Sequence, residues 1–458
     1  MSEADRELGE LPEGWQWRRV GEVCSFVGQG IDPTLSADSL YLGLEHIESW
    51  TGRIIRSGRS SDVKSSKSKF SQNDVLYGKL RPYLAKVVVA PSDGVCTTEL
   101  LVLRCNAEIR PQFMAHALRL RDNVNQVNDA TRGTQLPRAN GTILGAVAIP
   151  VPPIDEQRRI LTALESILEE VDRQRTRLER LRGVAGRTRR SVLAAAFRGD
   201  LAETTDINKE APSLSAVPAS RTVRRGVPDH VEMSDTVQAW PTPDSWAKAS
   251  VADLLRSGAI ADLKDGNHGS NHPKTSELGD VGLPFIMARE VRYFSIDYDG
   301  ARKVSGNVLA RIRVGFAKTG DVILTHKGTI GQVAVCDRDC VLTPQTTYIR
   351  CDPTRLLPRF VMYALASPWI ADQLSFISEQ TTRDFAPISE QYKLFLPVCP
   401  LEEQQEIVRI VDRWFAVLDD IDRRITRGLA LCDRLRESLL QKAFRGELLA
   451  PLGTTSPP

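Results

Sequence analysis

Residues 155–198 decide the fold of this chain; they are entered through VPPIDEQRRI and end in LAAAFRGDL. A second copy, residues 402–445, is entered through VCPLEEQQEI and ends in LLQKAFRGELL. The two copies are offset by 247 residues, so that Phe197 of the first falls on Phe444 of the second. Self-similarity at one fixed offset is the signature of a repeated architecture. We therefore expect one structural unit that the chain builds twice.

Apolar side chains recur in both copies at alternating spacings of four and three residues. This a/d register is typical of a coiled coil, in which a narrow apolar seam faces a partner helix. In the first copy the seam positions are Ile160, Leu164, Ile167, Val171, Gln174, Leu178, Leu181, Ala185, Thr188, Val192 and Ala195. In the second copy they are Ile407, Val411, Trp414, Leu418, Ile421, Ile425, Gly428, Cys432, Leu435 and Leu439.

Two matched seams in one chain predict that the two helices pair with each other, because they meet at high effective concentration. Prolines precede both helices, and Gly199 and Gly446 follow their last apolar residues, as helix ends require. A helix of this length is about 66 Å long. The alternative is that each seam pairs with a second copy of the chain. An antiparallel pair would impose a pseudo-two-fold symmetry on whatever the helices carry.

The bulk composition is that of a chain with several globular domains. Of 458 residues, 41% are apolar, and the net charge of +2 is the difference between 60 basic and 58 acidic residues. A total near zero does not exclude a basic face. The eight cysteines lack zinc-ligand spacing, which predicts reduced, buried thiols in a cytoplasmic protein. An acidic N-terminus and the lack of a long apolar run predict neither a signal peptide nor a membrane span.

The sequence divides into two mixed α/β domains, two long helices and a linker, which together predict an α+β fold. Short apolar runs bounded by turn residues read as strands, and the Ser-, Thr- and Pro-rich stretch between the halves reads as flexible. The predicted segments are a first domain at 1–150, a first long helix at 151–200, a flexible linker at 201–240, a second domain at 241–397, a second long helix at 398–450 and a tail at 451–458.

The second domain repeats the order of the first. Trp246 answers Trp15, and LTPQTTYIRC near the end of the second sheet answers CTTELLVLRC in the first. Between its tryptophan and the aligned aspartate (Asp74 or Asp321), the second domain is 16 residues longer. The extra length lies in a Gly-, Asn- and His-rich loop. We infer a shared scaffold that carries two different surface specificities.

Motifs of catalysis are absent from the sequence. We find no Gly-rich phosphate loop, no Asn-Pro-Pro-Tyr motif of amino-methyltransferases, no Glu-x-Lys of metal-dependent nucleases, and neither GxSxG nor HExxH. His268 and His272 lie four residues apart, but in a Gly/Asn loop that we interpret as a polar loop rather than a metal site. The pattern therefore favours binding over chemistry.

Polar and basic residues gather in corresponding loops of the two domains. Lys and Arg contact phosphates, and Arg, Gln, Asn and Thr also read base edges. Each alone is more often an ordinary surface residue, but their recurrence in both copies favours DNA binding. The candidates are Lys64, Lys67, Lys69, Lys79, Arg81, Arg132, Thr134, Gln135, Arg138, Lys264, Asn267, Lys327, Thr329, Thr382 and Arg383.

Taken together, the repeat resembles the specificity subunit of type I restriction–modification systems over nearly the whole chain. The resemblance rests on a Pro-x-x-Trp at the start of each half, an Asp-Val turn, a Pro-rich entry into Glu-Gln, and a closing Ala-Phe-Arg-Gly. These are Pro12 to Trp15 and Pro243 to Trp246, Asp74-Val75 and Asp321-Val322, Glu156-Gln157 and Glu403-Gln404, and Ala196 to Gly199 and Ala443 to Gly446.

This resemblance implies a non-catalytic protein that restricts and methylates foreign DNA only through its partners. It implies two target recognition domains, each reading one half of a bipartite double-stranded DNA site, and an antiparallel helix pair that holds two methyltransferase subunits. S-adenosylmethionine would bind those subunits and not this chain, and a nuclease–translocase subunit would join for cleavage. No membrane partner is implied. The alternative is a symmetric coiled-coil scaffold for proteins, without DNA specificity.

Overall fold

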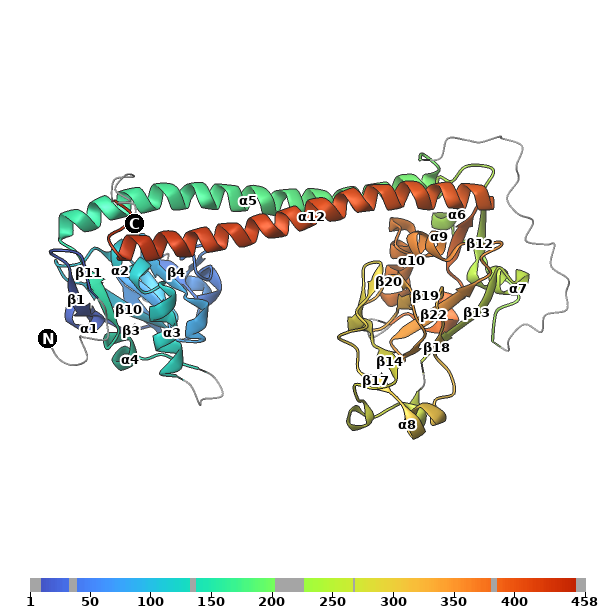
Figure 1. Cartoon of the computed structure of the whole chain (residues 1–458), viewed down its shortest axis with the longest axis horizontal. Coiled ribbons are helices and arrows are strands. Elements are labelled where there is room, and N and C mark those ends of the chain that lie inside the picture. Colours follow the sequence, from blue (N-terminus) through green and yellow to red (C-terminus); the bar gives the residue numbers. More distant parts are fainter. Residues whose placement is uncertain are drawn as a thin grey trace, which may run out of the picture. The chain divides into compact units, whose positions relative to one another are not determined.

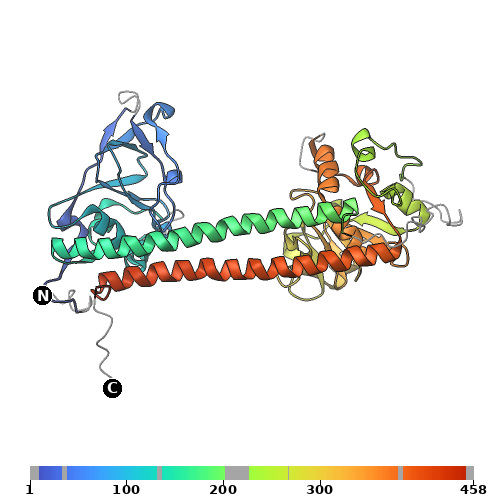
Figure 2. The same ribbon diagram turned by 90° about the horizontal axis from the view of Figure 1, so that it is seen from above.

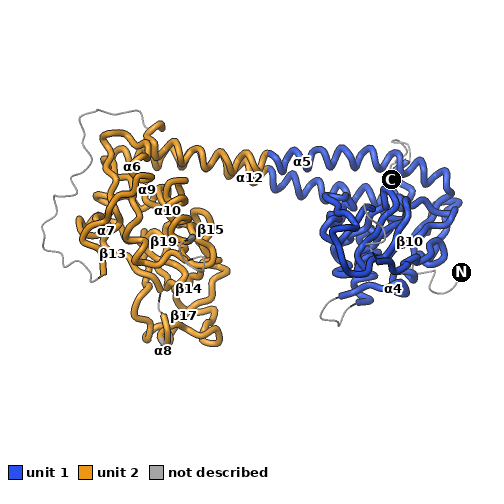
Figure 3. The backbone as a smooth tube through the Cα atoms, turned by 180° about the vertical axis from the view of Figure 1, so that it is seen from behind, with its two compact units in different colours: residues 1–180, 425–458 blue, residues 181–424 orange. Residues whose placement is uncertain are grey.

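In the computed structural model, the chain forms two compact units (Figures 1 and 3). The structure describes residues 10–32, 39–131, 137–201, 226–266, 268–379 and 385–449. Unit 1 comprises residues 1–180 and 425–458, and unit 2 comprises residues 181–424. Each long helix contributes to both units. The predicted boundaries separate helices from domains and do not coincide with these units, because each unit includes helix segments.

Unit 1 consists of short strands, small helices and parts of the two long helices. Its strands are β1 (Gln16–Arg19), β2 (Cys24–Phe26), β3 (Gln29–Ile31), β4 (Leu40–Leu42), β5 (Gly58–Arg59), β6 (Lys67–Phe70), β7 (Val75–Gly78), β8 (Val87–Val89), β9 (Gly94–Cys96), β10 (Leu100–Cys105) and β11 (Ala148–Val151). Its helices are α1 (Val20–Val23), α2 (Pro111–Ala117), α3 (Arg121–Asp129) and α4 (Gly141–Gly145), with segments of α5 (Ile154–Arg198) and α12 (Leu401–Phe444).

Unit 2 is built in the same way and completes the two long helices. Its strands are β12 (Ala247–Ser250), β13 (Ile260–Asp265), β14 (Leu283–Ile286), β15 (Val291–Arg292), β16 (Ser295–Ile296), β17 (Lys303–Val304), β18 (Phe316–Ala317), β19 (Val322–Thr325), β20 (Val333–Val335), β21 (Cys340–Leu342), β22 (Thr346–Cys351) and β23 (Phe395–Val398). Its short helices are α6 (Asp235–Gln238), α7 (Val251–Ser257), α8 (Gly306–Arg311), α9 (Pro358–Leu365), α10 (Pro368–Glu379) and α11 (Ile388–Gln391).

The central sheets confirm the predicted internal repeat. The strand order β2-β10-β7-β8 in unit 1 corresponds to β13-β22-β19-β20 in unit 2, and the pair β1-β11 corresponds to β12-β23. A buried aspartate directly precedes each of the strands β7 and β19 and accepts two hydrogen bonds from one arginine. Asp74 accepts from Arg104 at 2.8–2.9 Å, and Asp321 accepts from Arg350 at 2.6–2.8 Å. Such bidentate pairs fix geometry as well as charge.

The second sheet of each unit is repeated as well. The order β6-β9-β4-β5 in unit 1 corresponds to β18-β21-β14-β17 in unit 2, and the pairs β4-β9 and β14-β21 are both parallel. Unit 1 adds β3 at the edge of this sheet, whereas unit 2 has a separate β15-β16 ribbon. The two units therefore share both sheets and differ in the strands and loops attached to them.

Segments of α5 and α12 lie side by side in each unit, so the predicted pairing within one chain is confirmed (Figure 2). In unit 1, Asp172 pairs with Arg436, and Arg175 pairs with Asp433. Residue numbers rise along one helix as they fall along the other, so the helices are antiparallel. In unit 2, Arg189 donates to Asp419 and Asp422, both at 2.6 Å.

The prediction of a narrow seam was wrong at several positions. Ile160, Leu164 and Val171 are buried as expected, but six seam positions are exposed. These are Ile167, Gln174, Leu181, Trp414, Ile421 and Leu435. Other apolar residues, such as Leu168 and Leu193, are buried instead. The reason is that each helix also packs on the sheets and short helices of its unit, which widens and turns its buried face.

A fully buried glutamine near the start of each long helix makes hydrogen bonds to the domain that precedes the helix. In unit 1, the Gln157 side chain accepts from the Arg110 N–H at 2.9 Å and donates to the carbonyls of Glu108 and Pro152. Gln404 makes the same three bonds in unit 2. Because a buried amide without partners is costly, this motif requires glutamine and fixes the start of the helix.

The C-terminal end of α12 packs into unit 1, where α5 begins, and the C-terminal end of α5 packs into unit 2, where α12 begins. Phe444 of α12 lies 4.5 Å from Phe113 of α2 between ring centres, and Phe197 of α5 lies 5.2 Å from Phe360 of α9. After the helices, Gly446 lies against Pro12 in unit 1, where its positive φ of 77° suits glycine. The Pro-x-x-Trp and Ala-Phe-Arg-Gly motifs therefore belong to one contact in each unit.

The predicted linker at 201–240 lies largely outside the described residues, but its end is folded. Residues 235–238 form α6, and Trp240 is buried in unit 2. The Lys248 ammonium donates to three carbonyls at the end of this helix, at 2.7–3.0 Å. Val237 is buried with it, and Val227 and Val231 pack against the same core, so apolar residues anchor this end of the predicted linker. Within the described part of the chain, no helix is long and apolar enough to cross a membrane.

Candidate nucleic-acid interface

The central strands β7 and β19 end at corresponding places in the two units, where two loops meet. After β7, the Lys79 N–H donates to the Glu99 carbonyl and the Lys79 carbonyl accepts from Ala139, both at 2.9 Å. After β19, His326 makes the same two bonds, to Gln345 and from Ala386, also at 2.9 Å. We call the three side chains at this place the strand-end triad: Lys79, Glu99 and Arg138 in unit 1, and His326, Gln345 and Phe385 in unit 2.

The triad of unit 1 is charged. The Lys79 ammonium donates to the Thr98 carbonyl at 2.6 Å, and the Arg138 guanidinium donates to the Glu99 carboxylate at 2.7 Å. Arg138 remains half-exposed. Beside it, Arg81 is exposed, and its N–H donates to the Pro137 carbonyl at 3.1 Å. Three predicted DNA-binding residues therefore meet at one place.

The triad of unit 2 is neutral. The His326 side chain is fully buried, and neither of its ring nitrogens has a hydrogen-bond partner among the described residues. Burial lowers the pKa of His326 to about 4, so the ring is uncharged at neutral pH. Its ring centre lies 5.5 Å from that of Phe385, while the Lys327 ammonium lies 5.7 Å from the same ring. Lys327 and Thr329 are exposed beside this triad.

The lysines at and before β6 differ from one another. Lys64 and Lys69 are exposed and free to approach a phosphate. Lys67 is buried, and its ammonium donates to the Ser65 carbonyl at 2.7 Å and hydroxyl at 2.5 Å. It also lies 5.8 Å from the centre of the Tyr41 ring. Lys67 therefore holds the local fold in this structure rather than presenting its charge to solvent.

Lys264 lies on β13, half-buried, with its ammonium 3.3 Å from the Asp262 carboxylate. The remaining predicted DNA-binding residues lie outside the described part of the chain, and they stay predictions. These are Arg132, Thr134, Gln135, Asn267, Thr382 and Arg383.

The sequence analysis missed the neutral members of the site. His326, Gln345 and Phe385 carry no charge that would single them out, and Glu99 carries a charge of the wrong sign for a phosphate. A position-by-position reading of the repeat could have found them, because Lys79 falls on His326 and Arg138 on Phe385 at the same offset as the helices.

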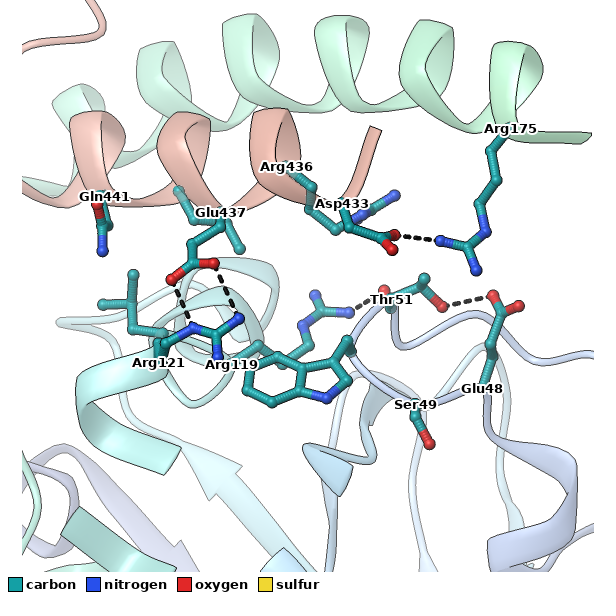
Figure 4. Close-up of a pocket in the computed structure, with 13 residues that line it drawn as sticks. Glu48, Ser49, Thr51, Arg119, Arg121, Arg175, Asp433, Arg436, Glu437 and Gln441 are labelled. Atoms are coloured by element: carbon teal, nitrogen blue, oxygen red, sulfur yellow. Dashed lines mark hydrogen bonds and ion pairs between the residues drawn. The ribbon is translucent and has the colours of Figure 1, made fainter. Parts of the chain in front are cut away.

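Unit 1 also contains a cavity of about 500 Å³ between the loop at 48–51, α3 and the helix pair (Figure 4). Arg121 donates to both Glu437 oxygens at 2.5 and 2.9 Å and lies 5.2 Å from the Trp50 ring centre. Arg119 donates to the Thr51 carbonyl, and its burial lowers its pKa to about 10, so it stays cationic at neutral pH. This cavity lies where the loop at 48–51 meets the two long helices.

The corresponding place in unit 2 is filled by aromatic rings. Phe294 follows a 3-10 turn as Trp50 does, and both have a left-handed φ, 67° and 65°. Its ring lies 5.2 Å from both Tyr363 of α9 and Phe415 of α12. The two units therefore use one backbone arrangement with a polar cavity in one and an aromatic cluster in the other.

Comparisons with known proteins agree with this architecture. The family model described as a type I restriction modification DNA specificity domain matches residues 12–182. The chain is 24% identical to the EcoKI specificity subunit of Escherichia coli (strain K12), covering 98% of this chain and 92% of that protein. It is 25% identical to the EcoBI specificity subunit of Escherichia coli, covering 76% and 67%.

A solved structure shares the fold. It comes from a study of complex assembly and conformational transition of the type I R-M system, and it aligns with a TM-score of 0.66 at 23% identity. The alignment covers 96% of this chain and 100% of that chain.

Proposed function

We propose, from the premise that this chain belongs to the specificity subunits of type I restriction–modification systems, that its two units read the two halves of one bipartite DNA target. The observation that carries the proposal is the pair of strand-end triads. They occupy the same place on a common sheet but differ in all three side chains. A scaffold that is repeated while its exposed loop residues differ suits two readers of different sequences.

The test begins with the target itself. Methylated adenines are mapped across a genome with and without this chain, which gives both half-sites and their spacer. Binding of the chain, assembled with its methyltransferase subunits, is then measured on DNA in which either half is scrambled. We expect specific binding to be lost in both cases. Tight binding that depends on one half alone would contradict the two-reader proposal.

The exposed apolar residues on the long helices support a docking surface for methyltransferase subunits. In each unit the sheets lie on one side of the helix pair (Figure 1). In unit 2, Trp414, Val417 and Ile421 follow each other at spacings of three and four on α12 and are all exposed. Phe415, which faces the recognition domain, is buried. By helical periodicity the exposed stripe therefore points away from that domain.

Unit 1 also carries exposed apolar residues on the helices, but they do not repeat the whole stripe. Ile167 is exposed at the position that corresponds to Trp414, whereas Glu170 and Gln174 stand at the positions of Val417 and Ile421. On α12 of unit 1, Leu431 and Leu435 are exposed one turn apart. Large apolar side chains on an otherwise charged surface mark an interface with another protein. Exposed apolar residues on the helices of both units suit two copies of the same partner.

The stripe of unit 2 can be tested by itself. The double variant Trp414→Asp and Ile421→Asp places charge on the stripe of unit 2, with Arg413→Ala on the same helix as its control. We expect the double variant to bind one methyltransferase subunit instead of two, measured by light scattering of the assembled complex, while the control binds two. Undiminished binding of two subunits by the double variant would show that the docking surface lies elsewhere.

We place the chemistry of the complex on its partners. The methyltransferase subunits would bind S-adenosylmethionine, and a nuclease–translocase subunit would join for cleavage. Titration calorimetry should detect S-adenosylmethionine binding to the assembled complex and none to this chain alone. Methyl transfer by the purified chain alone would overturn this assignment. A steep loss of DNA affinity with salt, as phosphate contacts give, would distinguish DNA recognition from a protein-only scaffold.

A further inference from the structure

We infer that the strand-end triads select the base pair that each unit prefers: the charged triad of unit 1 a G·C pair, and the neutral triad of unit 2 an A·T pair. This inference rests on the proposed function and makes it more specific. It assigns a role to three neutral residues, His326, Gln345 and Phe385, that carry no charge to attract a phosphate.

The first step is that the His326 ring has no hydrogen-bond partner of normal geometry among the described residues. A neutral imidazole has one donor and one acceptor nitrogen. In unit 2 both are buried, and only the Ala386 backbone acts on the ring as a hydrogen-bonding group. An unsatisfied buried polar group costs about 1–3 kcal/mol, and native structures keep such groups mainly where they have a role. Among the residues that the structure describes, no cluster of three or more His, Cys, Asp or Glu side chains could hold a metal ion.

The second step is the place of His326 in the fold. Its backbone is bonded to Gln345 and Ala386, so the loops on both sides of β19 meet at this residue. Gln345 is only half-buried, and the exposed Lys327 follows directly in the chain. A basic side chain next to neutral hydrogen-bonding groups is the combination that positions DNA on a phosphate and reads a base beside it.

The third step is the difference in chemistry between the triads. Arg and Lys pair best with the two acceptors of guanine, and a carboxylate accepts from the cytosine amino group. Arg138, Lys79 and Glu99 supply these groups in unit 1. Gln offers the donor and acceptor that match adenine, and an aromatic ring such as that of Phe385 suits the thymine methyl group.

The test exchanges the residues of one triad and reads both half-sites. The single variant Gln345→Glu and the double variant Gln345→Glu with Phe385→Arg give unit 2 the groups of unit 1. Binding of the assembled complex is selected from a DNA library in which all half-site positions vary. We expect the preference at one position of one half-site to move from A·T toward G·C by about tenfold or more, with the other half-site unchanged.

His326→Leu tests the buried ring separately, because it removes both nitrogens and keeps an apolar group of moderate size. It should weaken discrimination at the same or the adjoining base pair. The variant Glu99→Gln is the matched change in unit 1 and should alter only the other half-site. Circular dichroism melts of each variant show that the units remain folded.

Two failures are distinguishable. If the unmodified complex shows no bipartite preference, the proposed function fails. If it shows one, and folded Gln345 and His326 variants keep every preference of the wild type, then this inference is wrong. A shift at the half-site read by unit 1 would likewise overturn the assignment of triads to half-sites.

Discussion

We call the place where the loop around Trp50 in unit 1, or around Phe294 in unit 2, meets the long helices the loop–helix joint, and the two joints differ in chemistry. In unit 2, Phe294 packs into a cluster with Tyr363 and Phe415. In unit 1, Trp50 borders a cavity crossed by ion pairs such as Arg121–Glu437. Half-exposed ion pairs contribute little to stability, whereas buried rings contribute several times more. The same backbone arrangement can therefore contribute different amounts to the stability of the two units.

The largest effect should come where the units are alike, in the helix seam. Val171 in unit 1 and its repeat equivalent Leu418 in unit 2 are both buried. Val171→Asp or Leu418→Asp buries a charge without a partner and should cost more than about 3 kcal/mol in either unit. Chemical unfolding measures the loss, and loss of bipartite DNA binding should accompany it. A variant that still assembled and read both half-sites would contradict the antiparallel pairing.

The joints themselves should respond unequally to removal of their aromatic side chains. We expect Phe294→Ala to destabilise unit 2 by about 2–3 kcal/mol, because its ring contacts three others. Trp50→Ala should cost unit 1 about 1 kcal/mol, since one face of its ring borders the cavity. Hydrogen exchange read separately for each unit gives both values. Equal losses would show that the cavity of unit 1 is as well packed as the cluster.

Acid should destabilise unit 2 through His326. Its pKa in the folded state is about 4, below the unfolded value of about 6.5, so the unfolded chain binds the proton first. The neutral His326 ring therefore contributes about 3 kcal/mol to the free energy of unfolding above pH 6.5, and this contribution is lost as the pH falls toward 4. Asp265, His268 and Lys327 face the ring and act on the same range. Melting curves at pH 5 and pH 7 should differ less for His326→Leu than for the wild type.

Salt should produce the smallest difference between the joints. Arg121→Ala removes the bidentate pair with Glu437, whose members are about half and one-third exposed. We expect a loss of less than about 1 kcal/mol at low salt and almost none in 1 M NaCl, because ions screen exposed pairs. The same salt change should leave the Phe294 joint unaffected. A loss that persists at high salt would mean that Arg121 acts through its stacking on Trp50.

The sequence was informative wherever a pattern repeats over many residues. The heptads predicted both long helices and their pairing, and the offset of 247 predicted the common sheet. The predicted burial of Ile167 and Trp414 was wrong. Periodicity shows that a residue is apolar, but it does not show which neighbouring element covers that residue. The candidate site was found only through its charges. Nothing in the types of His326 and Gln345 distinguishes a binding residue from a core residue until the backbone places them together.

The contact of Phe444 with Phe113 has a consequence for how the protein is made. Most of unit 1 precedes unit 2 in the sequence, yet its core includes Ala443 and Phe444 of α12, which follow unit 2. That helix segment is translated about 245 residues after the rest of unit 1, which takes roughly 10 to 50 s at ordinary rates of synthesis. During that time the apolar surface around Phe113 has no cover. Until that segment of α12 is made, the exposed apolar surface of the nascent chain is prone to aggregation, and a chaperone that covered it would favour correct folding.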